Sequence, residues 1–105
     1  MTLPTPYAEE VLDVVARIPA GRVLSYGDIA RLLDRGGPRS VGLVMSRWGG
    51  GVPWWRVVRA DGTPAGCHAG QALRRLRAER TPLDSGGARV DMATARWDGR
   101  WPARS

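Results

Sequence analysis

The sequence lacks lysine and phenylalanine altogether and contains one cysteine and one histidine. The lone Cys67 excludes an internal disulfide, and with His68 as the only histidine no Cys/His cluster has metal-site spacing. No apolar run approaches the roughly 20 residues of a membrane span. Residues 1–10 include Glu9 and Glu10 and lack the apolar segment of a signal peptide. We therefore expect a cytoplasmic protein without a disulfide, a metal or other cofactor, or a membrane contact.

Because lysine is absent, all 16 basic residues are arginines, and against 10 acidic residues they give a formal net charge of +6. The planar guanidinium suits phosphate recognition and stacking. The basic excess therefore predicts a polyanionic partner. Since phenylalanine is absent, five tryptophans carry the large apolar volumes. The length is that of one domain, so we expect residues 1–105 to form a single monomeric unit, with its core at about 7–83 and the tail 84–105 packed on it.

Apolar spacing and capping residues predict three helices in the first half of the chain, over residues 7–18, 26–33 and 38 to about 48. The second helix follows Ser25, a good N-cap residue, and Asp28 lies three residues further on in the capping-box position. The second and third helices are short and joined by a glycine-containing turn. This pattern predicts a helix-turn-helix.

The third predicted helix has an outward face that suits close contact with a partner. Ser40 and Gly42 are small, and small residues allow another molecule to approach the backbone closely. Arg39 and Arg47 lie at opposite ends of the helix and are placed to flank whatever it docks on. We therefore expect this helix to present its outward face to a partner.

The stretch from Gly49 to Arg59 contains three glycines, a proline, two tryptophans and the predicted strand 57–58. Pro53 favours extended geometry in the residue before it. In an extended backbone Trp54 and Trp55 would point to opposite sides. One indole can then line the core while the other faces a groove or pocket.

The second half of the chain is predicted to contain one basic helix and a folded-back tail. A turn at residues 61–62 and a loop over 63–69 lead into a helix from residue 70 or 71 to about residue 80. Leu73 and Leu76 are expected to anchor this helix to the core. Trp97 and Trp101 are expected to fold the tail back onto the domain.

The order of these segments resembles the C-terminal DNA-binding domain of the O6-alkylguanine-DNA alkyltransferases over roughly residues 7–83. The motifs that carry the resemblance are Gly-Arg-Val-Leu-Ser-Tyr-Gly-Asp-Ile-Ala at 21–30, Pro-Arg-Ser-Val-Gly at 38–42 and Pro-Trp-Trp-Arg-Val-Val at 53–58, followed by Gly62. The resemblance implies a mainly α fold with short strands, of the winged helix-turn-helix type found in this family.

One departure from the alkyltransferases is decisive. Their motif reads Pro-Cys-His-Arg, whereas here Trp54 replaces the acceptor cysteine and Trp55 replaces the histidine that activates it. An indole cannot act as a thiolate nucleophile. The combination resembles the alkyltransferase-like proteins, which bind the lesion without alkyl transfer and flag it for nucleotide excision repair. The resemblance thus implies a non-enzymatic protein whose partners are duplex DNA containing O6-alkylguanine and nucleotide excision repair proteins.

The resemblance also implies roles for individual residues. Tyr26 would crowd the DNA backbone and promote nucleotide flipping, and Arg39 would enter the minor groove and fill the vacated stack. Arg56 matches a structural arginine of the family, and Glu79 matches the glutamate behind its Cys-His pair. The expected pocket residues are Tyr26, Val52, Pro53, Trp54, Cys67, His68 and Ala69. The expected DNA-binding residues are Tyr26, Arg39, Ser40, Gly42, Arg47 and Arg56.

Two other functions remain open at this point. The protein could be an active alkyl acceptor that uses Cys67 as its thiol. It could also be a sequence-specific winged-helix transcription regulator, which would bind lesion-free operator DNA as tightly as damaged DNA. Adjacency of Cys67 and His68 in a loop is not by itself the geometry of a nucleophile and its base.

Overall fold

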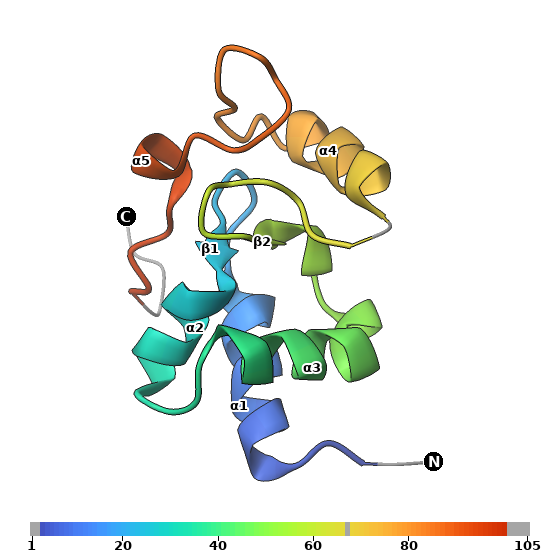
Figure 1. Cartoon of the computed structure of the whole chain (residues 1–105), viewed down its shortest axis with the longest axis vertical. Coiled ribbons are helices and arrows are strands. Elements are labelled where there is room, and N and C mark those ends of the chain that lie inside the picture. Colours follow the sequence, from blue (N-terminus) through green and yellow to red (C-terminus); the bar gives the residue numbers. More distant parts are fainter. Residues whose placement is uncertain (1–2, 67, 101–105) are drawn as a thin grey trace.

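The computed structural model describes residues 3–66 and 68–100, so Cys67 and Trp101 lie outside the described residues. Short helices surround one small sheet (Figure 1). The elements in chain order are α1 (Pro6–Arg17), β1 (Leu24–Ser25), α2 (Tyr26–Leu33), α3 (Pro38–Trp48), the 3-10 turns η1 (Gly49–Gly51) and η2 (Trp54–Arg56), β2 (Val57–Val58), α4 (Ala69–Ala78) and α5 (Met92–Ala95). The predicted mainly α fold with short strands is confirmed.

Helices α1, α2 and α3 pack around the main core. Val11 and Val15 of α1, Ile29 of α2, and Val41 and Val44 of α3 are all buried in it. Their spacing follows the helical period, which is why the sequence pattern located these three helices correctly. The turn between α2 and α3 completes the predicted helix-turn-helix.

A capping box starts α2 at the predicted residue. The backbone N–H of Asp28 donates to Ser25 Oγ at 3.0 Å, and the backbone N–H of Ser25 donates to Asp28 Oδ2 at 2.9 Å. Arg96 Nε also donates to Asp28 Oδ2, at 3.0 Å. Burial alone would raise the pKa of Asp28, but the bonds from Ser25 and Arg96 outweigh it and hold that pKa below its usual range. One carboxylate therefore caps α2 and ties it to the tail.

The sheet joins the two halves of the molecule. β1 pairs in parallel with β2, with Leu24 opposite Val57 and Ser25 opposite Val58. In Figure 1 the sheet lies between the half that holds α1, α2 and α3 and the half that holds α4 and α5. Because β1 leads directly into α2 and β2 follows η2, this pairing brings Tyr26 near the tryptophan turn.

A second, smaller core lies under α4 and the tail and is formed by Val23, Val58, Leu76, Val90 and Ala95. Ala72 and Leu76 are the buried residues of α4, whereas Leu73, expected as an anchor, is only half-buried. The tail returns alongside β1, where the backbone N–H of Trp97 donates to the backbone carbonyl of Val23 at 2.9 Å. As a whole residue, Trp97 is 8% exposed. No described helix is long and apolar enough to cross a membrane.

The turn at Gly62 contacts the tail so closely that adding one methyl group at Gly62 should greatly lower the stability of the protein. Gly62 has φ +91°, and a Cβ there would lie 2.2 Å from the Val90 carbonyl oxygen. Gly66 has φ +79°, but a Cβ there would meet nothing within 4 Å. Gly66→Ala should therefore cost only the left-handed backbone, about 1–2 kcal/mol. Gly62→Ala should cost several kcal/mol because the backbone must also shift. Urea unfolding of both variants measures the difference, and equal losses would contradict this account of the turn.

Candidate nucleic-acid interface

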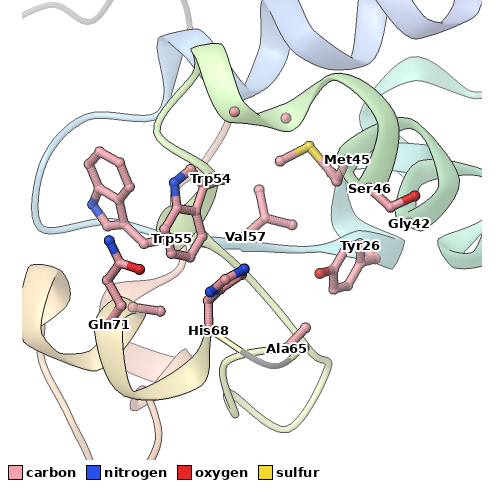
Figure 2. Close-up of a pocket in the computed structure, with 14 residues that line it drawn as sticks. Tyr26, Gly42, Met45, Ser46, Trp54, Trp55, Val57, Ala65, His68 and Gln71 are labelled. Carbon is pink, nitrogen blue, oxygen red and sulfur yellow. The ribbon is translucent and has the colours of Figure 1, made fainter.

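A pocket of about 650 Å³ opens where α2, α3, η2 and the start of α4 meet. Figure 2 shows Tyr26 on the far side of the opening from Trp54 and His68, with Val57 between them. The ring centroids of Trp54 and His68 are 6.1 Å apart. The lining residues are Tyr26, Gly42, Met45, Ser46, Gly49, Gly50, Trp54, Trp55, Val57, Ala65, Gly66, His68, Gln71 and Ala72. The pocket therefore has aromatic side chains on two sides.

Val52 is extended, as expected for the residue before a proline, but the chain turns tightly at Pro53, directly before the tryptophans. Pro53 has φ −71° and ψ 73°, and the backbone N–H of Trp54 donates to the backbone carbonyl of Val52 at 2.6 Å. This is an inverse γ-turn. The chain then continues into the 3-10 turn η2, in which Trp54 and Trp55 are consecutive. Both indoles line the pocket, and because this backbone is not extended, the alternation of side chains expected for an extended segment does not apply.

The two indoles support each other edge-on. Their centroids are 5.7 Å apart and their planes meet at 87°, a favourable aromatic arrangement. Trp55 also packs against the smaller core, and its ring lies 4.6 Å from the Arg75 guanidinium carbon and 5.4 Å from that of Arg56. Trp55 is thus fixed between two cations, and it holds Trp54 in place at the pocket.

A partly buried ion pair fixes the tryptophan turn. Arg56 Nε donates to Glu79 Oε1 at 3.0 Å, another guanidinium nitrogen binds Glu79 Oε2, and a third donates to the Ile18 carbonyl at 2.7 Å. Both side chains are 16% exposed. Burial alone would raise the pKa of Glu79, but the Arg56 hydrogen bonds, the nearby Trp55 indole and the Arg56 charge hold it below its usual range. The expectation that Arg56 contacts DNA is corrected, because its guanidinium is already engaged inside the domain.

Three further pocket predictions were wrong. Val52 packs against the main core, and Pro53 occupies the centre of the γ-turn, so neither lines the pocket. Ala69 begins α4, and the helix turns Gln71 and Ala72 toward the pocket in its place. Cys67 lies outside the described residues.

Sequence reasoning missed the contribution of α3 to the pocket wall. Gly42, Met45 and Ser46 line the pocket, and Gly49 follows on the same side. Residues spaced by three, four and seven share one helix face, so the helical period could have grouped them. Gly42 leaves open space, since a Cβ there would meet nothing within 4 Å.

The neighbouring face of α3 carries exposed arginines. Arg39 is exposed, and no ion pair or side-chain hydrogen bond joins it to another residue of the described ranges. Arg47 is exposed and lies over the Trp48 ring at 5.9 Å. Ser40 was expected on this face, but its hydroxyl bonds the N–H and carbonyl of Gly37 and lies 3.1 Å from the Tyr7 hydroxyl. Ser40 therefore caps α3 and is half-buried, and its contact with DNA stays a prediction.

Tyr26, the first residue of α2, keeps its phenol neutral. Burial raises the pKa of Tyr26, and the positive charge of Arg59 lowers it by less. A neutral phenol remains a hydrogen-bond donor at the mouth of the pocket. Within residues 3–66 and 68–100, no three His, Cys, Asp or Glu side chains gather as metal ligands. The arrangement offers aromatic surface, hydroxyl groups and nearby positive charge.

The sequence model of the 6-O-methylguanine DNA methyltransferase DNA-binding domain matches residues 6–81. The chain belongs to this family. Family members with curated descriptions include the Escherichia coli (strain K12) DNA base-flipping protein, 38% identical over 101 residues that cover 88% of this chain and 74% of that protein. A methylated-DNA–protein-cysteine methyltransferase from Methanothermobacter thermautotrophicus is 38% identical over 73 residues, 68% of this chain and 41% of that enzyme. The family thus contains both an enzyme and a protein named for base flipping.

Solved structures of similar proteins include complexes with DNA. S. pombe Atl1, bound to damaged DNA containing O6-carboxymethylguanine, superimposes with a TM-score of 0.75 at 28% identity, over 92% of this chain and 98% of Atl1. Mycobacterium tuberculosis OGT in complex with DNA gives a TM-score of 0.65 at 31% identity, over 78% of this chain and 55% of that one. The helix-turn-helix fold of the family is therefore confirmed for this chain.

Because Glu79 must be ionised to pair with Arg56, the free energy of unfolding that this ion pair contributes should depend on pH. Glu79→Gln should lower the free energy of unfolding at neutral pH by about 2–4 kcal/mol, because it leaves a mostly buried guanidinium without its counter-charge. The folded-state pKa of Glu79 is depressed, so its contribution is present above the unfolded-state pKa and is lost as pH falls through the folded-state value. Stability should therefore fall less steeply with acid in Glu79→Gln than in the wild type.

The matched control for that measurement is Asp13→Asn. Asp13 pairs with Arg17 at 3.2 Å, but their side chains are 61% and 39% exposed. An exposed pair contributes about 0–1 kcal/mol. Urea unfolding between pH 3 and 7 compares the two variants, and equal losses would show that the Arg56–Glu79 pair does not fix the turn.

Proposed function

We propose that this protein recognises O6-alkylguanine in duplex DNA without transferring the alkyl group. The helix-turn-helix docks through α3 in the minor groove, and the damaged nucleotide flips into the pocket beside it. The stable complex then flags the lesion for nucleotide excision repair. The observation that carries this proposal is an aromatic-walled pocket that opens beside the arginine-bearing face of α3.

The size and lining of the pocket suit a single base. Its volume of about 650 Å³ falls within the range of about 300–1,000 Å³ that is usual for small-molecule sites. Stacking a base on an aromatic ring contributes about 1–3 kcal/mol. Unstacking costs a few kcal/mol, and less for a damaged base that pairs poorly. Stacking on Trp54 can thus offset much of the flipping cost for the lesion.

The α3 face supplies the other needs of a flipping protein. Arg39 is exposed at the start of the helix, and a planar guanidinium can stack in the gap left by the flipped base. The surrounding arginines supply sequence-independent phosphate contacts. The Escherichia coli relative described as a base-flipping protein and the Atl1 complex with damaged DNA support this assignment.

The chemistry of the acceptor position argues against alkyl transfer. Trp54 occupies the place of the acceptor cysteine in the alkyltransferase motif, and an indole is not a thiolate nucleophile. Glu79, which matches the glutamate behind the family's Cys-His pair, binds Arg56 instead. With no nucleophile in the motif, the output of binding is the complex itself, which fits a protein that recruits repair partners.

Lesion preference should depend on Trp54. In titrations of labelled duplexes with and without one O6-methylguanine, the wild type should bind the damaged duplex more tightly. Trp54→Ala should weaken binding to the damaged duplex by roughly 5- to 100-fold, the loss of one stacking interaction, and change binding to undamaged DNA little. The control Arg47→Ala should weaken binding to both duplexes equally. Equal affinity of the wild type for both duplexes would favour a sequence-specific regulator.

Intact-protein mass tests the absence of alkyl transfer. After incubation with O6-methylguanine DNA, the mass of the protein should be unchanged, because no described residue of the motif can accept the methyl group. Cys67→Ser should bind the damaged duplex as the wild type does. A stable gain of one methyl group that disappears in Cys67→Ser would establish the alternative of an alkyl acceptor.

A further inference from the structure

Helix α3 carries an exposed leucine that neither the core nor the pocket uses. Leu43 is 62% exposed. The other large apolar side chains exposed in the described part of the chain are Leu3, in the N-terminal lead-in, and Leu32. Leu32 of α2 lies against the tail, because a Cβ on Gly99 would come within 2.7 Å of it. The high exposure of Leu43 has no such structural explanation.

The position of Leu43 on α3 links it to the DNA-facing arginines. It lies four residues after Arg39 and four before Arg47, so the three share one stripe of the helix. Both arginines are exposed. Next to this stripe, Gly42 and Ser46 line the pocket. Leu43 is therefore an apolar residue between two cations, beside the mouth of the pocket.

This placement indicates the kind of surface that Leu43 contacts. A phosphate would be bound by the arginines at the two ends of the stripe, whereas leucine gains only from apolar contact. The minor groove presents both kinds of surface, with phosphates along its rims and sugars and base edges inside. Apolar side chains that enter the minor groove partly unstack base steps and widen the contact.

We propose that Leu43 is an apolar probe that enters the minor groove beside Arg39 and packs on the sugars and base edges there. This inference rests on the proposed function, since it uses the same docking face. It adds a contact that is independent of the lesion and of charge. Its contribution should therefore appear in binding to any duplex and should not depend on salt.

The test is the affinity of Leu43→Ala for duplexes with and without O6-methylguanine, measured at several salt concentrations. The helix should be retained, because alanine is a good helix former and the site is exposed. Affinity for both duplexes should fall by the same factor, roughly 3- to 10-fold, from lost apolar burial. The slope of log affinity against log salt should stay unchanged, because no counterion release is lost.

Two control variants define the comparison. Leu32→Ala removes an exposed leucine away from the α3 face and should bind both duplexes as the wild type does. Arg47→Ala should weaken binding and reduce the salt slope by about 1, as expected for one lost phosphate contact. Leu43→Ala should match neither control.

Three results would overturn the inference: unchanged binding by Leu43→Ala, a loss confined to the damaged duplex, or a change of oligomeric state in sedimentation velocity that makes Leu43 a contact between two copies of the chain. Failure of the proposed function has a different signature, because the wild type would then show no lesion preference. If lesion preference persists and depends on Trp54 while Leu43→Ala binds normally, only the inference about Leu43 fails.

Discussion

The pocket depends on one guanidinium. Arg56 binds the Ile18 carbonyl just after α1 and the Glu79 carboxylate just after α4, and it also contacts the Trp55 ring. The turn that carries Trp54 is therefore tied to both halves of the molecule. The turn is reached from α3 through three glycines, and a Cβ on Gly50 or Gly51 would meet nothing within 4 Å. A rigid aromatic wall loses little entropy on binding, which favours affinity.

The same sheet that joins the two halves positions the remaining parts of the site. Pairing of β1 with β2 places Tyr26 opposite the tryptophan turn, and the Ser25–Asp28 capping box fixes the start of α2. α3 then presents one face to the pocket and the adjacent face, with Arg39, to solvent. Recognition of the base and contact with the phosphates thus come from neighbouring faces of one short helix.

Local signals in the sequence were sufficient for the helices and insufficient for the pocket. Ser25, Asp28 and the apolar periodicity determine α2 through contacts within a few residues, so its bounds could be predicted. Val52 is extended, as its place before Pro53 predicts, but it packs against the main core, and the γ-turn is centred on Pro53. The contacts that keep both residues out of the pocket come from the tertiary structure. The setting of Trp55 between Arg56 and Arg75 involves residues far apart in the chain, and no local pattern encodes it. Trp54 could be recognised as the acceptor position only by comparison with the family motif, because two adjacent tryptophans do not by themselves indicate a lost nucleophile.

The central claim is that the damaged base leaves the helix and stacks on Trp54. The position of the O6-methylguanine base in a crystal structure of the protein bound to a damaged duplex tests it most directly. The account predicts an extrahelical base against the Trp54 ring, with the Arg39 guanidinium in the vacated stack and α3 in the minor groove. A base that remains stacked within the duplex, with the pocket empty, would contradict it.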